Sequence, residues 1–134
     1  MTTGTYSRWT SPSSGGSAGA DVLVTVEVAV QPLDAVYLKS ADLYAQADAT
    51  AIATMPVAGF IVSKPSPTTG LLRSAGNLGG LTLVADTEYY AAKVAGQITS
   101  TPPAVAGNVV QGVGRSKNAT TLTIAVQDDD YTIL

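Results

Sequence analysis

The sequence predicts an all-β protein: a compact antiparallel β-sandwich or barrel of short strands, preceded by a flexible N-terminal arm. Three observations support this prediction. A valine-rich stretch alternates with period two, Gly and Pro turns recur at short intervals, and the first 20 residues contain almost no aliphatic side chain. The length of 134 residues suits one domain. We therefore expect an arm over residues 1–20 and a single all-β domain over residues 21–134.

The arm reads MTTGTYSRWTSPSSGGSAGA. Such a segment buries too little apolar surface to offset the entropy of ordering, so alone it should be flexible. It nonetheless carries Tyr6, Arg8 and Trp9, and these residue types are enriched at binding hot spots. Two interpretations stay open: the three residues bind a partner, or Trp9 folds back onto its own domain.

The first half of the domain begins with DVLVTVEVAV, in which Val22, Val24, Val26, Val28 and Val30 share one face. This alternation predicts a strand with one buried face, ended by QPLD. AVYLKS predicts a second strand, and ADLYAQAD its hairpin partner or a short turn. ATAIATM suits a helical turn or an irregular segment. PVAGFIVSK predicts a strand whose glycine marks a bulge or a close backbone approach.

The second half alternates weaker strands with turns. PSPTTG is expected to be a loop, and LLRSAGNLGG a weak strand ending in a Gly-Gly turn. The remaining expected strands are 81–84, 88–94, a short one near 97–100, 108–116, 120–126 and 131–134. Turns at Ala85-Asp86, Ala95-Gly96 and Lys117-Asn118, the loop TPPAVAG and the turn DDD separate them.

A weak internal repeat appears at an offset of 53 residues, where VAGFIVSK lies over VQGVGRSK. Gly59 then corresponds to Gly112, and Tyr37 to Tyr90. The repeat suggests two similar β units, at about residues 34–70 and 87–126.

The composition excludes several classes of function. The chain has no cysteine and no histidine, so it lacks disulfides, thiolate metal sites and the commonest general base. Its net charge is -3 and it has no run of Lys or Arg, which argues against nucleic-acid binding. Neither a secretory leader nor a membrane-spanning apolar window is evident, so we expect no membrane partner and synthesis in a cytoplasm.

Charged residues make up only 13% of the chain, and the apolar content comes mostly from Ala and Val. Small side chains bury little area each, at roughly 25 cal/mol per Å². We therefore expect a thin core and a surface that is covered by copies of the chain or by a partner. The alternative is a small Ala-rich monomer with a Ser- and Thr-rich surface.

The stretch GNVVQGVGRSK, residues 107–117, raises the question of phosphate binding. A P-loop requires Lys and Ser/Thr directly after the second glycine, but Val113 follows Gly112. A dinucleotide fingerprint requires a third glycine, and Lys117 stands there instead. We therefore predict that the stretch builds sheet, with alternate residues on opposite faces.

No catalytic, cofactor-binding or metal-binding residues are predicted. Asp128 to Asp130 are consecutive, without the spacing of a calcium loop, and fit a solvated turn. Asp86 and Glu88 could form an acid/base pair, but they more simply decorate a turn and the exposed face of a strand. Ser63-Lys64 and Ser116-Lys117 are neighbours on predicted strands, where side chains face opposite ways.

One pattern resembles tailed-phage structural proteins, namely capsid cement (decoration) proteins and head- or tail-fibre domains. Over about residues 34–126, a Leu-Thr step leads to a Tyr-Tyr strand, a Gly turn, an Ile-Thr step, a Pro-x-x-x-Gly loop, Val-x-Gln-x-Val-Gly and a closing strand. These positions are Leu81-Thr82, Tyr89-Tyr90, Gly96, Ile98-Thr99, Pro103 to Gly107, Val109 to Gly114 and Leu122 to Ile124. The chain departs from the pattern at Ala85-Asp86, where a glycine turn is usual, and at Arg115, where a small or apolar residue often stands.

The resemblance implies a non-enzymatic virion component on the outer capsid surface, assembled in the host cytoplasm. It implies binding to the major capsid protein and self-association, often as a homotrimer, with no cofactor. Arg115 is then a candidate partner contact, and Tyr6, Arg8 and Trp9 are candidate capsid contacts in the arm. The alternatives are a head- or tail-fibre module that binds a host-surface glycan, and a small hydrolase that uses Asp86 and Glu88.

Overall fold

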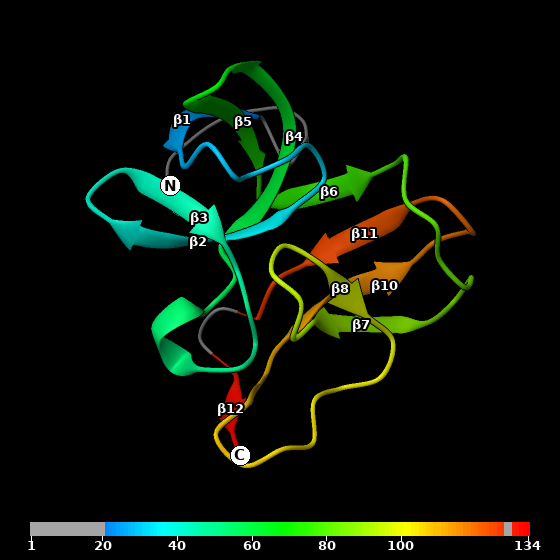
Figure 1. Ribbon diagram of the computed structural model, residues 1–134. Helices are drawn as coiled ribbons and strands as arrows, with labels where there is room; N and C mark the ends of the chain where they lie inside the picture. Colours follow the sequence, from blue (N-terminus) through cyan, green and yellow to red (C-terminus); the bar gives the residue numbers. More distant parts are fainter. Residues whose placement is uncertain (1–20, 128–129) are drawn as a thin grey trace, which may run out of the picture.

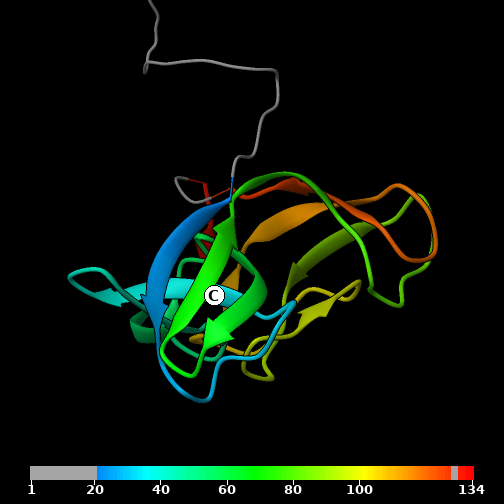
Figure 2. The same cartoon turned by 90° about the horizontal axis from the view of Figure 1, so that it is seen from above.

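The computed structural model describes residues 21–127 and 130–134, and these form an all-β fold, as the sequence predicts (Figure 1). A closed five-stranded barrel packs beside an open five-stranded sheet, and a short two-stranded ribbon lies near the C-terminus. Figure 2 shows the barrel and the open sheet side by side. The three residues Tyr6, Arg8 and Trp9 lie outside the described residues.

The barrel contains the first five strands in the order β1-β3-β2-β4-β5. Their bounds are β1 Val22–Val26, β2 Ala35–Ser40, β3 Leu43–Gln46, β4 Gly59–Ser66 and β5 Thr69–Arg73. β1 pairs in parallel with β3, through Thr25 opposite Leu43, whereas the other neighbours are antiparallel. The barrel is therefore antiparallel, as predicted, except at this one pair. An odd number of strands cannot alternate in direction around a closed ring, so one pair must be parallel.

The open sheet has the order β6-β11-β10-β7-β8. Its strands are β6 Ala75–Leu78, β7 Glu88–Ala91, β8 Ile98–Thr99, β10 Gly112–Ser116 and β11 Leu122–Ala125, and β9 Val109–Val110 pairs with β12 Thr132–Ile133. A shift of 53 residues carries β1, β2, β3, β4 and β5 onto or beside β6, β7, β8, β10 and β11. The order of neighbours is then the same in both sheets, except that β6 and β8 do not meet.

Several sequence predictions differ from the structure. The first strand ends at Val26, before the end of the alternating stretch. Of the five alternating valines only Val26 and Val30 are buried, and Val28 is 65% exposed. Residues 65–70 are not a loop: β4 runs to Ser66 and β5 begins at Thr69. The ladder shifts register between Ser63 and Ser66, so the proline there interrupts no regular pairing. Residues 81–84 form no strand.

The 107–117 stretch builds sheet, as predicted, with Val109–Val110 in β9 and Gly112–Ser116 in β10. Ile52–Thr54 form a single 3-10 turn. The glycine predicted to mark a close approach does so, because a Cβ on Gly59 would lie 2.7 Å from the carbonyl oxygen of Arg73.

The apolar side chains form two clusters. One lies inside the barrel and contains Val26, Val30, Val36 and Ile61. The larger one is shared between the barrel and the open sheet; its aromatic members are Tyr37, Phe60 and Tyr89. Phe60 and Ile61 are neighbours on β4, both fully buried, and alternation along a strand sends them into different clusters.

A buried glutamine joins the two sheets. The Gln111 side chain is 0% exposed; its Oε1 accepts a hydrogen bond from Val57 N at 2.7 Å and its Nε2 donates to Val57 O at 3.1 Å. The side-chain amide thus replaces a neighbouring strand for one residue of the barrel half. This pairing satisfies backbone groups that would otherwise be buried without partners.

Candidate functional site

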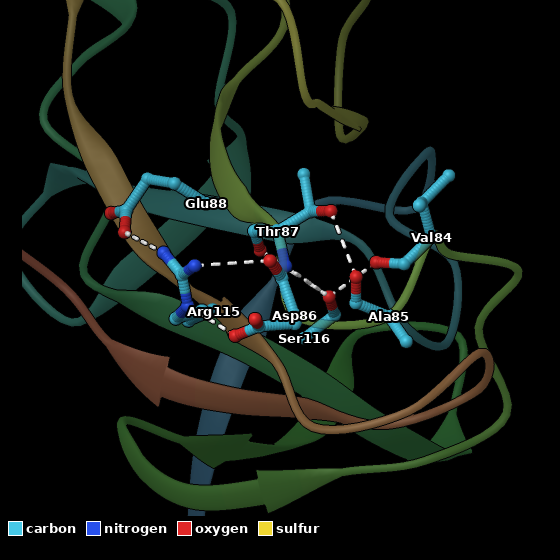
Figure 3. A network of polar contacts seen from close by, with 7 residues as sticks. All are labelled: Val84, Ala85, Asp86, Thr87, Glu88, Arg115 and Ser116. Atoms are coloured by element: carbon cyan, nitrogen blue, oxygen red, sulfur yellow. Dashed lines mark hydrogen bonds and ion pairs between the residues drawn. The ribbon is translucent and has the colours of Figure 1, made fainter.

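Arg115, the candidate partner contact, lies on β10 opposite Glu88 of β7. Its Nε donates to Asp86 Oδ1 at 2.9 Å, and its Nη2 donates to the Asp86 carbonyl oxygen at 3.0 Å. Glu88 Oε1 lies 3.8 Å from Nη1 (Figure 3). The structure therefore brings Arg115 together with both acidic residues that the sequence singled out.

A second set of hydrogen bonds holds the turn that presents Asp86. Ser116 Oγ is buried; it accepts from Thr87 N at 2.9 Å and donates to the Val84 carbonyl oxygen. Tyr89 OH accepts from Val84 N at 2.9 Å. Asp86 itself has a φ of 55°, in the left-handed region that Asp tolerates better than most residues. The turn expected at Ala85-Asp86 is thus formed without the usual glycine.

The cluster of Arg115, Asp86 and Glu88 is exposed to solvent, and its opposite charges partly offset one another. The side chains of Arg115, Asp86 and Glu88 are 55%, 88% and 40% exposed. Both carboxylates face one guanidinium. Exposed ion pairs of this kind contribute about 0–1 kcal/mol to stability.

A second arginine caps an edge of the open sheet. Arg73 Nε and Nη2 bind the two carboxylate oxygens of Asp21 at 2.8 and 3.0 Å, and Nη1 donates to the Asn77 carbonyl oxygen at 2.7 Å. The hydrogen bond from Arg73 lowers the pKa of the Asp21 carboxyl below its ordinary value. The point where residue 21 enters the fold is therefore fixed to β5 and to β6.

An apolar groove of about 760 Å³ lies beside β8. Val94 and Val105 line it and are 66% and 56% exposed; Ile98, Pro102 and Pro103 complete its apolar wall. Nothing predicted from the sequence pointed to this groove. The available signal was that Val94 and Val105 each stand among turn-forming Gly, Ala or Pro residues, where a valine has no strand to bury it.

A smaller groove of about 400 Å³ lies on the barrel, along β1 and β3. Val22 and Leu23 line it and are 56% and 61% exposed. Exposed aliphatic side chains in grooves, rather than scattered singly, are typical of surfaces that another molecule covers.

Across residues 21–127 and 130–134, no three acidic side chains gather closely enough to hold a metal ion. The helical content of this described part includes nothing long and apolar enough to cross a membrane. No protein-family model matches the sequence, and no curated protein matches it.

Proposed function

We propose that the protein is a non-enzymatic virion structural component that decorates a phage capsid and stabilises it by bridging major capsid protein subunits. The observation that carries the proposal is the pairing of a sparsely charged chain with two grooves lined by exposed valine and leucine. Apolar surface of this kind is stabilised when a neighbouring molecule covers it.

In this proposal the β body self-associates, as a homotrimer, through its exposed aliphatic surface. The arm over residues 1–20 binds the capsid through Tyr6, Arg8 and Trp9, and Arg115 adds a charged contact from the body. Because a trimer presents three arms, modest contacts combine into high overall avidity. The protein then occupies the outer capsid surface after assembly in the host cytoplasm.

Removal of residues 1–20 tests the role of the arm. We expect the shortened protein to keep its fold and oligomeric mass but to lose occupancy on purified capsids, measured by sedimentation and quantitative gel analysis. The variant Trp9→Ala/Tyr6→Ala should reproduce most of this loss, and Thr2→Ala/Thr3→Ala, elsewhere in the arm, should not. Full occupancy by the shortened protein would contradict the role of the arm.

Copy number separates this proposal from a fibre module that binds a host glycan. A cement protein should copurify with capsids in hundreds of copies, whereas a fibre module should be present in few. Light scattering gives the second criterion: a solution mass of 13.6 kDa at all concentrations, meaning a monomer, would contradict self-association.

A further inference from the structure

The equivalent strands β3 and β8 differ in how many neighbouring strands they pair with. In the barrel, β3 pairs on one side with β2 and on the other with β1. In the open sheet, β8 pairs with β7 alone. β8 therefore ends the open sheet with one side unpaired within the described part of the chain.

The backbone of Ile98 points to this unpaired side. Ala91, opposite Ile98, donates its N–H to the Gln111 carbonyl oxygen on the β10 side. Ala91 and Ile98 are therefore a non-hydrogen-bonded pair, in which both residues direct their N–H and C=O away from each other. Among the described residues, nothing is hydrogen-bonded to this outer N–H or C=O.

The barrel shows what fills this position. Tyr44 of β3 stands opposite Leu38, just as Ile98 stands opposite Ala91, and Leu38 and Ala91 are 53 residues apart. The outward carbonyl oxygen of Tyr44 accepts a hydrogen bond from Glu27 N at 3.0 Å, where the chain leaves β1. Tyr44 is thus capped by an extended, parallel segment with Val22, Val24 and Val26 at alternate positions.

The apolar groove adjoins the bare edge of β8. Ile98 borders both, and Val94 and Val105 expose most of their side chains in the groove. Main-chain groups at a sheet edge, together with adjacent pockets for alternate side chains, are the two components of strand-addition sites. Among the described residues that line the groove, Lys93 alone is charged.

We propose that β8 and this groove form an acceptor site for an extended segment of a partner protein. The segment adds parallel to β8, as β1 adds to β3, and carries an aliphatic residue at every second position. Its backbone pairs with Ile98, and its aliphatic side chains cover Val94 and Val105. This inference is independent of the capsid role, because it rests on the internal counterpart within the fold.

The test uses the full chain and a peptide of residues 21–28, DVLVTVEV, with two lysines and a fluorophore added at its N-terminus. We expect saturable binding by fluorescence anisotropy and slower hydrogen exchange at the Ile98 amide in the complex. The peptide variant Glu27→Pro, which removes the N–H that caps Tyr44 in the barrel, should bind at least tenfold more weakly. A loss of tenfold corresponds to about 1.4 kcal/mol, near the value of one backbone hydrogen bond.

Two variants of the protein localise the binding. Ile98→Pro removes the outward N–H, and Val94→Asp places a charge in the groove; each should weaken binding at least tenfold. Val84→Asp is the matched control, since Val84 is 65% exposed and lies outside the groove, and it should bind as the unaltered protein does. The folded state of each variant is checked by circular dichroism. If Ile98→Pro does not fold, Val94→Asp alone tests whether the peptide binds at the groove.

Several results would overturn the proposal. Absence of saturable binding is one, and binding unchanged by Val94→Asp is another. Protection of the Ile98 amide in the free protein that grows with concentration would show that a second copy fills the edge. Peptide binding that requires prior removal of residues 1–20 would show that the arm of the chain itself fills it.

Discussion

The barrel and the open sheet have the same order of strands, but only the barrel is closed. β3 has four residues, LYAQ, and continues the ladder to β1; β8 has two, and Pro102-Pro103 follow soon after it. Proline has no N–H for a ladder, so the strand cannot be prolonged there. β1 is VLVTV, whereas its counterpart β6 is AGNL with Gly76 at a φ of 91°. Closure thus depends on a few residues at equivalent positions, within one shared arrangement.

Removing the largest fully buried side chain of the shared cluster should have the greatest effect. Phe60→Ala is expected to lower the free energy of unfolding by about 3–5 kcal/mol, because the ring is fully buried between the two sheets. Both sheets should unfold in one transition, measured by urea denaturation followed through tyrosine fluorescence and circular dichroism. Ile61→Val, confined to the barrel cluster, should cost only about 0.5–1.5 kcal/mol. Two separate transitions in Phe60→Ala would mean that the sheets are independent.

The second largest loss of unfolding free energy is expected when the hydrogen bonds of the Gln111 side chain are removed. Gln111→Leu leaves Val57 N–H and C=O buried without partners, so we expect a loss of roughly 2–4 kcal/mol of unfolding free energy. The matched control is Gln97→Leu, an exposed glutamine, which should change the same quantity by less than about 0.5 kcal/mol. Equal effects of the two substitutions would contradict the role assigned to Gln111.

The two counterpart glycines sharpen the comparison between the sheets. A Cβ at residue 59 would lie 2.7 Å from the backbone oxygen of Arg73, which cannot move without distorting β5. A Cβ at residue 112 would lie 2.8 Å from Gln127 Oε1, the flexible end of a side chain. Gly59→Ala should therefore cost about 1–3 kcal/mol, and Gly112→Ala less than about 1 kcal/mol. Thermal unfolding measures both, and the reverse order would contradict this account.

The smallest effect concerns the ion pair at the start of the barrel. Because the pKa of Asp21 is lowered in the folded state, its contribution is present above the ordinary value near 3.8 and is lost as the pH falls below that value. Asp21→Asn should therefore cost less than about 1 kcal/mol at pH 7, and the difference from the unaltered protein should be smaller at pH 2 than at pH 7. Chemical denaturation at both pH values measures this, and an unchanged difference at pH 2 would exclude Asp21 as its source.

Much of the fold could be predicted from local patterns. Alternation and turn residues predicted β2 with its exact bounds, and Gly59 marked a close approach because a glycine inside a strand has few other uses. Closure of the barrel could not be predicted, since it depends on β1 meeting β3 in parallel across a loop. The strand assigned to 81–84 was wrong because its residues bond to the 119–120 turn rather than to a ladder.

The candidate contacts were predictable only in part. Arg115, Asp86 and Glu88 were each singled out, but the ladder register that places Arg115 opposite Glu88 is not visible along the chain. The groove was missed because it depends on the hairpin at 92–99 facing the loop at 101–105. Hydropathy patterns report which residues a strand buries; they do not report which turns lie side by side.

The hydrogen bond from Arg73 to the Asn77 carbonyl oxygen has a consequence for growth by stacking. Fibre formation requires each unit to offer two adhesive ends, one to join the preceding unit and one to recruit the next. Here the Arg73 guanidinium occupies the Asn77 carbonyl oxygen on β6, whereas among the described residues no group is hydrogen-bonded to the outer side of Ile98 on β8. We therefore expect another chain to pair at the β8 edge more readily than at Asn77, which disfavours growth from both ends of the sheet.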